Sequence, residues 1–124
     1  MKKLMTRTVA ALAVVATVLG TCTVASAQGS LFRLFPGRVQ TFTAMVYGGQ
    51  LARVEVRGDR DPRADLDLYV YDAYGNLVAV DDDSTNFCIG QWVPNFTGVV
   101  TIRVVNHGWV YDDYNLLMWG GYFR

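Results

Sequence analysis

Cysteine, lysine and histidine are scarce in this sequence of 124 residues. The two cysteines are Cys22 and Cys88, both lysines precede residue 4, and His107 is the single histidine. This composition excludes a framework of several disulfides and a zinc site built from cysteine and histidine clusters. Residues 28–124 contain eight arginines and eleven acidic residues, a formal charge of −3, which argues against partners such as nucleic acids and anionic membranes.

The first 27 residues have the pattern of a secretory signal peptide. They begin with a positively charged segment, continue with an apolar stretch over residues 9–19, and end with small residues at 25–27. The apolar stretch is shorter than the roughly 20 residues that a membrane-spanning helix needs. We therefore predict cleavage after Ala27, a secreted or periplasmic location without membrane association, and a single domain over residues 28–124.

Cys88 would be the one thiol left after removal of the signal peptide, so the domain would have no internal disulfide. It lies in the apolar run Phe87-Cys88-Ile89, which is typical of a buried thiol that packs as a small hydrophobic residue. A reactive thiol and an intermolecular disulfide are the alternatives, and the sequence leaves the oligomeric state open.

Short runs of β-branched and aromatic residues alternate with turn residues along the rest of the chain. No segment of ten or more residues has the 3.6-residue apolar period of an amphipathic helix. Strands are predicted over residues 39–47, 51–57, 66–71, 77–80, 87–93, 99–105 and 114–119, and residues 31–34 are a candidate eighth strand. This spacing predicts an all-β fold, namely an antiparallel β-sandwich of jelly-roll-like form with seven to eight strands.

The strongest alternation lies in residues 65–71 and continues into the next predicted strand. The residues expected to face the core are Leu66, Leu68, Val70, Val78 and Val80. A type I turn plus bulge, with Gly75 in the left-handed conformation, provides a register that places both strands on the same core. It pairs Tyr71 with Leu77, Tyr69 with Ala79, Asp67 with Asp81, and Asp65 with Asp83.

This register would bring four carboxylates together, although like charges directly opposite one another destabilise a strand pair. A bound Ca²⁺ would offset the repulsion, because it takes six to eight oxygen ligands. The candidate metal ligands are Asp65, Asp67, Asp81 and Asp83, and Ca²⁺ is the one cofactor predicted. The alternative is that the strands separate beyond Ala79 and that residues 81–83 form a solvated turn.

Four segments of the chain together resemble the bacterial pre-peptidase C-terminal domain, a β-sandwich module attached to secreted proteases. They are residues 65–71 (DLDLYVY), 75–79 (GNLVA), 98–104 (GVVTIRV) and 114–116 (YNL), within a match over residues 40–119. The resemblance implies a sandwich that is not itself catalytic and that in some members binds Ca²⁺ and assists substrate binding or secretion. Calcium-binding members take several ligands from an acidic segment before the first strand, whereas residues 28–54 contain no Asp or Glu.

Groups for nucleophilic catalysis are few, because residues 28–124 contain one histidine, one cysteine and two serines. The sequence also has no phosphate-binding glycine-rich loop. We therefore predict no enzymatic activity. The leading hypothesis is a secreted accessory module that binds an extracellular polypeptide or polysaccharide, and a small hydrolase that uses the acidic cluster is an alternative.

Aromatic residues are plentiful, and all of them follow residue 27, so some must lie on the surface. The candidates for a surface that stacks on sugar rings or grips a polypeptide are Tyr69, Tyr71, Trp92, Trp109, Tyr111, Trp119 and Tyr122. A carbohydrate-binding module is therefore a further hypothesis. The alternative is that these side chains fill the core and its edges.

Overall fold

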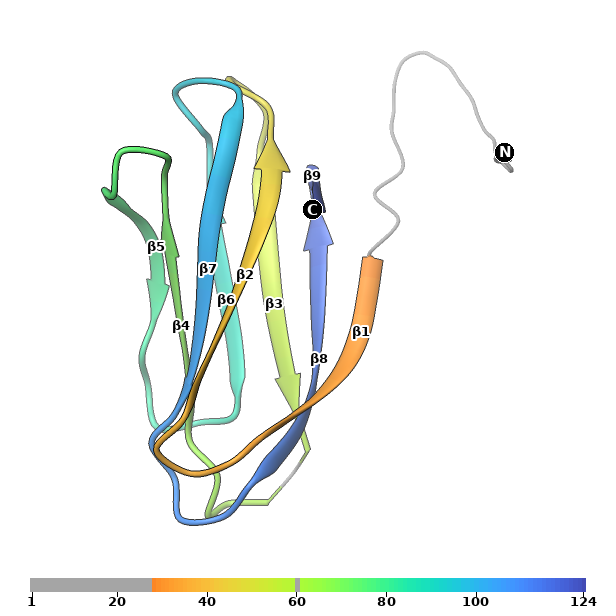
Figure 1. Ribbon diagram of the computed structural model, residues 1–124, viewed down its shortest axis with the longest axis vertical. Helices are drawn as coiled ribbons and strands as arrows, with labels where there is room; N and C mark the ends of the chain where they lie inside the picture. The colour runs from red at the N-terminus through yellow and green to blue at the C-terminus, as the bar shows by residue number, and fades with distance from the viewer. Residues whose placement is uncertain (1–27, 60) are drawn as a thin grey trace.

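Nine β-strands make up the computed structural model, which describes residues 28–59 and 61–124 (Figure 1). The strands are β1 (Gln28–Leu34), β2 (Val39–Val46), β3 (Ala52–Gly58), β4 (Leu66–Tyr71), β5 (Leu77–Asp81), β6 (Phe87–Trp92), β7 (Gly98–Asn106), β8 (Asp112–Trp119) and β9 (Gly121–Phe123). They form two antiparallel sheets, with the strand orders β1-β8-β3-β6 and β5-β4-β7-β2-β9. The predicted antiparallel β-sandwich is confirmed, and β9 is a strand that the sequence pattern did not indicate. Among the described residues, no helix is long and apolar enough to cross a membrane.

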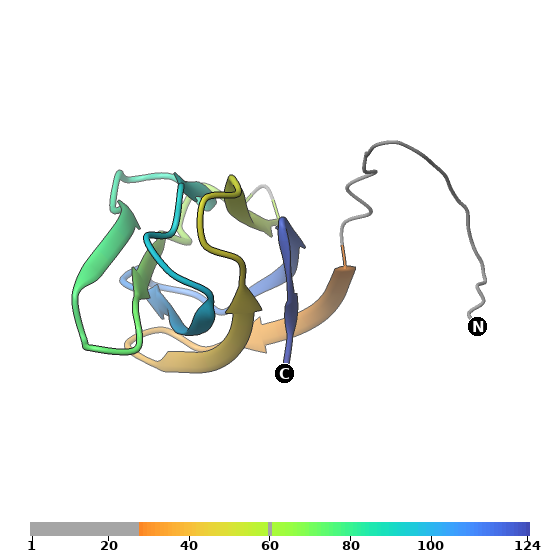
Figure 2. The same ribbon diagram turned by 90° about the horizontal axis from the view of Figure 1, so that it is seen from above.

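One face of each sheet is buried in a common interior, which Figure 2 shows along the long axis of the molecule. Leu66, Leu68 and Val70 of β4 are fully buried, as the alternation of residues 65–71 predicts. Cys88 is also fully buried, and its thiol donates a hydrogen bond to the carbonyl oxygen of Leu66 at 2.9 Å. Cys88 is therefore buried among apolar residues as predicted, and burial raises the pKa of its thiol. The predicted signal peptide lies outside the described residues.

The turn between β4 and β5 has the predicted geometry. Gly75 has a φ of 83°, and Tyr71 lies opposite Leu77. A β-bulge then interrupts the pairing, so that Val70 lies opposite Ala79. The bulge adds one residue to β5, and the rest of the hairpin is therefore shifted by one residue from the predicted register.

This shift reverses the face on which the following residues of β5 lie. Asp81 lies opposite Leu68, so its predicted pairing with Asp67 is wrong. Val80 lies opposite Tyr69 on the outer face and is 45% exposed, so its predicted place in the core is also wrong. Because side chains alternate along a strand, a single inserted residue is enough to produce both differences.

Loops gather at the two ends of the sandwich, which we call the lower and upper ends as they appear in Figure 1. The lower end carries the loops that follow β1, β3, β5 and β7. The upper end carries the loops that follow β2, β4 and β6. Each end thus brings together segments that are far apart in the sequence.

Candidate functional site

Asp65 and Asp67, two of the four predicted calcium ligands, lie together at the start of β4. The Asp67 side chain is almost completely buried, and its Oδ2 lies 3.1 Å from Nε2 of His107. The Tyr69 hydroxyl donates a hydrogen bond to the same oxygen at 3.4 Å. Within the described part of the chain, Oδ1 of Asp65 and Oδ1 of Asp67 are buried without a hydrogen-bond partner. Burial, and after it the charge of Asp65, raises the pKa of Asp67.

The other two predicted ligands have separate hydrogen-bond partners. Asp81 Oδ2 accepts a hydrogen bond from the backbone N–H of Ile89 in β6 at 2.8 Å. Asp83 Oδ1 accepts hydrogen bonds from the hydroxyl and the backbone N–H of Thr85 at 2.7 and 3.0 Å, and these bonds lower the pKa of Asp83. Over residues 28–59 and 61–124, no group of three or more His, Cys, Asp or Glu side chains is placed to hold a metal ion. The register that motivated the Ca²⁺ site is thus not observed, and Ca²⁺ binding itself stays a prediction.

The lower end combines exposed aromatic side chains with charged ones. Trp109 is 87% exposed, and the exposed rings of Phe35 and Tyr111 lie 5.8 Å apart between their centres. A depression of about 400 Å³ lies at this end and is lined by Phe35, Pro36, Asp59, Asp61, Arg63, Trp109, Val110 and Tyr111. We call these eight residues the aromatic end. Its volume is within the range of small-ligand sites.

The fully buried side chain of Asn106 links two of the loops that form the aromatic end. Its Nδ2 donates hydrogen bonds to the carbonyl oxygen of Leu34, next to Phe35, at 3.0 Å and to that of Val110 at 2.9 Å. Its Oδ1 accepts a hydrogen bond from the backbone N–H of Gly108 at 2.8 Å. The backbone on either side of the exposed aromatic rings is therefore fixed by a buried polar group.

The third loop of the aromatic end, which follows β3, is held in a similar way. The carbonyl oxygen of Arg63 accepts a hydrogen bond from the backbone N–H of Trp109 at 2.9 Å. Asp112 Oδ1 accepts one from the backbone N–H of Asp59, also at 2.9 Å. Within the loop, Arg63 donates two hydrogen bonds to the carboxylate of Asp61 at 3.0 and 2.8 Å, which keep the Asp61 pKa at about 2.

Asp112 lies beneath this loop with its side chain fully buried. Burial raises its pKa to about 6 against the opposing effect of the hydrogen bond from the Asp59 N–H, and the Asp59 charge adds to the increase. Its Oδ2 is buried without a hydrogen-bond partner among the described residues. The buried Asp112 carboxyl therefore titrates near pH 6.

An arginine from β1 covers one face of Tyr111. The guanidinium carbon of Arg33 lies 4.1 Å from the centre of the Tyr111 ring, within the range of a cation–π interaction. Arg33 is also paired with Asp113, with 2.7 Å between Nε and Oδ1. Arg33 and Arg63 therefore each have a carboxylate partner beside the aromatic end.

The remaining aromatic candidates lie elsewhere. Of the residues named from the sequence, Trp109 and Tyr111 are brought together, whereas Tyr69, Tyr71, Trp92 and Trp119 are half-buried in or beside strands, and Tyr122 is exposed on β9. Sequence reasoning missed Phe35 and the charged members of the loop that follows β3. The turn residues Pro36 and Pro62 beside them were the available signal, since proline marks loops at which binding residues often lie.

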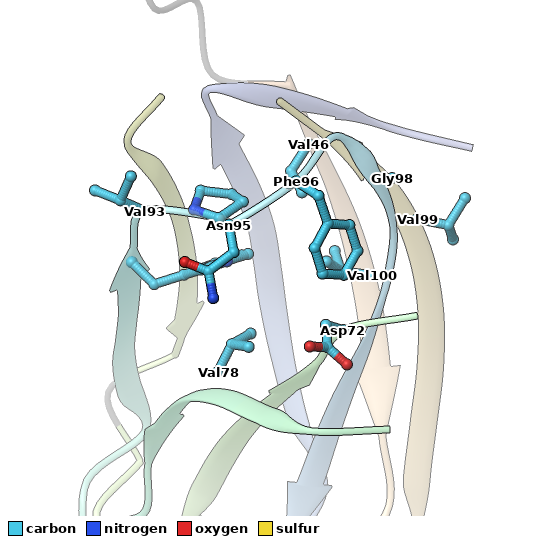
Figure 3. A pocket seen from close by; sticks show the side chains of 11 residues that line it. Val46, Asp72, Val78, Val93, Asn95, Phe96, Gly98, Val99 and Val100 are labelled. Carbon is cyan, nitrogen blue, oxygen red and sulfur yellow. The ribbon is translucent and has the colours of Figure 1, made fainter. Parts of the chain in front are cut away.

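A second pocket opens at the upper end of the sandwich (Figure 3). It has a volume of about 170 Å³ and is lined by Val46, Asp72, Val78, Trp92, Val93, Pro94, Asn95, Phe96, Gly98, Val99 and Val100. We call it the apolar pocket, because Asp72 and Asn95 alone among these residues carry a carboxylate or an amide. The four predicted calcium ligands line neither this pocket nor the aromatic end.

No protein-family model matches the chain, and no curated protein matches it. The resemblance to pre-peptidase C-terminal domains therefore stays a prediction. The two sites described above are assigned from their geometry and chemistry.

Proposed function

We propose that this chain is an exported, non-catalytic β-sandwich module that binds polysaccharide through the aromatic end. The export rests on the predicted signal peptide, and the module character rests on the confirmed sandwich and the scarcity of nucleophiles in the sequence. Of the two predicted partner classes, extracellular polypeptide and polysaccharide, the composition of the aromatic end favours polysaccharide.

The exposure of Trp109 on a fixed loop is the observation that carries the proposal. With 87% of its surface exposed, this side chain contributes little to packing of the core. The backbone of Trp109 is nevertheless held in place. Its N–H donates a hydrogen bond to the carbonyl oxygen of Arg63, and the N–H of the neighbouring Gly108 donates one to the buried side chain of Asn106. Fixing the backbone that carries a large exposed ring lowers the entropy lost when a ligand stacks on that ring.

The polar groups of the aromatic end suit a neutral, hydroxylated ligand. A sugar ring offers an apolar face to an aromatic side chain and hydroxyl groups at its rim. Asp61 and Arg63 form a bidentate pair, and the Asp61 carboxylate oxygens keep lone pairs that can accept hydrogen bonds from hydroxyls. The pairing of Asp61 with Arg63 leaves a surface that carries charges of both signs, which suits a ligand without a strong charge of its own.

Affinity electrophoresis in gels that contain soluble xylan, glucomannan or β-1,3-glucan tests this function. We expect at least one polysaccharide to retard the wild-type domain, and Trp109→Ala to weaken that binding by about tenfold or more, as for an aromatic hot spot. Tyr74→Ala is the matched control, because Tyr74 is 79% exposed at the opposite end and should bind as the wild type does.

Two results would contradict the proposal. Equal retardation of wild type and Trp109→Ala would remove the aromatic end as the binding surface. Release of reducing sugar during incubation with a retained polysaccharide would show an enzyme and would revive the hydrolase alternative.

A further inference from the structure

We propose that the apolar pocket is a second binding site, separate from the aromatic end, which accepts a benzene-sized apolar group that carries a positively charged amino head. Nothing in this inference depends on polysaccharide binding, because the two sites lie at opposite ends of the sandwich. The size of the pocket, the hydrogen-bonded loop that closes it and the charge at its rim define this ligand.

The size and lining of the pocket set the apolar part of the ligand. Its volume of about 170 Å³ is close to that of apolar protein cavities that bind benzene. Val78 of β5, Trp92 of β6 and Val100 of β7 supply walls on three sides, and Figure 3 shows Phe96 standing over the space between the strands. A single aromatic ring, or a branched alkyl group of the same size, would replace water along these walls.

The loop after β6, which closes the pocket, is fixed from two sides. The carbonyl oxygen of Pro94 accepts a hydrogen bond from the backbone N–H of Gly49 at 2.8 Å. The hydroxyl oxygen of Thr97 accepts one from the backbone N–H of Gly48 at 2.9 Å. The Phe96 ring meets the edge of Tyr74, with 5.2 Å between ring centres, and so connects this loop to the turn after β4. The pocket is therefore formed before a ligand arrives.

Asp72 sets the charge of the ligand. Its Oδ1 accepts hydrogen bonds from the backbone N–H groups of Tyr74 and Asn76, each at 2.9 Å, and its Oδ2 accepts one from Nδ2 of Asn76 at 3.2 Å. The hydrogen bonds from Asn76 are the main reason that the pKa of Asp72 is lowered, so the carboxylate is ionised at neutral pH. A carboxylate oxygen accepts two hydrogen bonds, which leaves room at Oδ2 for an ammonium group.

The remaining lining strengthens this preference for a cation. The eleven residues of the pocket include no arginine, so the single formal charge at the site is negative. The amide of Asn95 stands across the pocket from Asp72 in Figure 3 and can accept a further hydrogen bond from an amino head. An anionic head on the same apolar group would be repelled.

Three probes with the same ring test the inference: benzylamine, benzyl alcohol and benzoate. We expect titration of ¹⁵N-labelled full-length mature domain to shift the amide signals of residues 92–99 and the indole signal of Trp92. Benzylamine should bind most tightly and benzoate least tightly, with up to about fivefold between benzylamine and benzyl alcohol, the size of an exposed ion-pair contribution.

Three variants assign the parts of the site. Val78→Phe should fill the pocket and abolish the shifts, whereas Val80→Phe places the same ring on the exposed face of β5 and should leave them unchanged. Asp72→Asn keeps the acceptor oxygen that bonds Tyr74 and Asn76 but removes the charge. It should equalise the affinities for benzylamine and benzyl alcohol.

Any of three results would overturn the inference. The first is a titration of the wild type in which the shifted signals do not belong to residues 92–99. This result does not depend on whether any variant folds. The second is benzoate binding as tightly as benzylamine, and the third is an unchanged preference in Asp72→Asn. Polysaccharide retardation measured on the same samples reports the aromatic end separately, so failure at one site is distinguishable from failure at the other.

Discussion

The two ends of the sandwich hold their loops in place by different means. At the aromatic end, one backbone link from Trp109 to Arg63 is joined by hydrogen bonds from the loops to the buried side chains of Asn106 and Asp112. At the apolar pocket, the links run between backbone groups and one exposed hydroxyl, from Gly49 to Pro94 and from Gly48 to Thr97. Buried polar side chains cost much more to disturb than exposed ones, so stability and binding should be coupled at the lower end and separable at the upper end.

The largest expected effect comes from removing the buried amide at the lower end. Asn106→Ala leaves two carbonyl oxygens and one N–H without their partner, so we expect a loss of about 3–5 kcal/mol in the free energy of unfolding. Urea unfolding measures it. Asn95→Ala at the upper end is the control and should change stability by less than about 0.5 kcal/mol, because Asn95 is exposed.

Asn106→Ala also tests whether ligand binding at one end of the sandwich is independent of the other end. Under conditions in which Asn106→Ala is folded, polysaccharide retardation should fall while the benzylamine shifts at the apolar pocket persist. Loss of both activities, or of neither, would show that the two ends do not differ in the proposed way.

A smaller effect concerns pH. The Asp112 carboxyl has a pKa of about 6 in the folded protein and 3.8 as its ordinary value, so the folded state binds this proton more tightly. Stability should therefore rise as the pH falls from 7 toward 4, by up to about 3 kcal/mol in total. At still lower pH, Asp61 and Asp113, whose pKa values are lowered by arginine partners, lose those partners and stability declines.

Asp112→Asn isolates this contribution, because an asparagine oxygen can still accept the hydrogen bond from the Asp59 N–H. The increase in unfolding free energy from pH 7 to 4.5 should be clearly smaller in the variant than in the wild type, with any remaining increase assigned to the buried Asp67. A wild-type domain that becomes less stable between pH 7 and 4.5, or a variant that keeps the full slope, would contradict the assignment.

The smallest effect tests the calcium hypothesis, which concerns neither end pocket. Binding of Ca²⁺ at ten times its dissociation constant would stabilise the fold by about 1.4 kcal/mol. The hypothesis predicts a higher unfolding midpoint in millimolar CaCl₂ than in chelator, and loss of that difference in Asp67→Asn. Identical midpoints in the wild type would remove Ca²⁺ from the description of Asp65 and Asp67.

The strands and the core of β4 could be predicted because they depend on local alternation, as Leu66, Leu68 and Val70 illustrate. The actual register of β5 could not be predicted, because one bulge moved Asp81 to the other face. Bulges of this kind have no reliable local signal in the sequence. The aromatic end was only half predicted. Trp109 and Tyr111 stand out as aromatic residues, but their neighbours come from loops that long-range strand pairing brings together.

The pairing of β1 with β8 has a consequence for the order of folding. The ion pair between Arg33 and Asp113 joins residues 80 positions apart, and β8 is the one strand to which β1 is bonded. During synthesis, which starts at the N-terminus, β1 must therefore stay unpaired until nearly all of the domain has been made. Such non-local pairing predicts folding in milliseconds to seconds and a late-docking first strand, which leaves Leu31 open to misassociation until β8 is available.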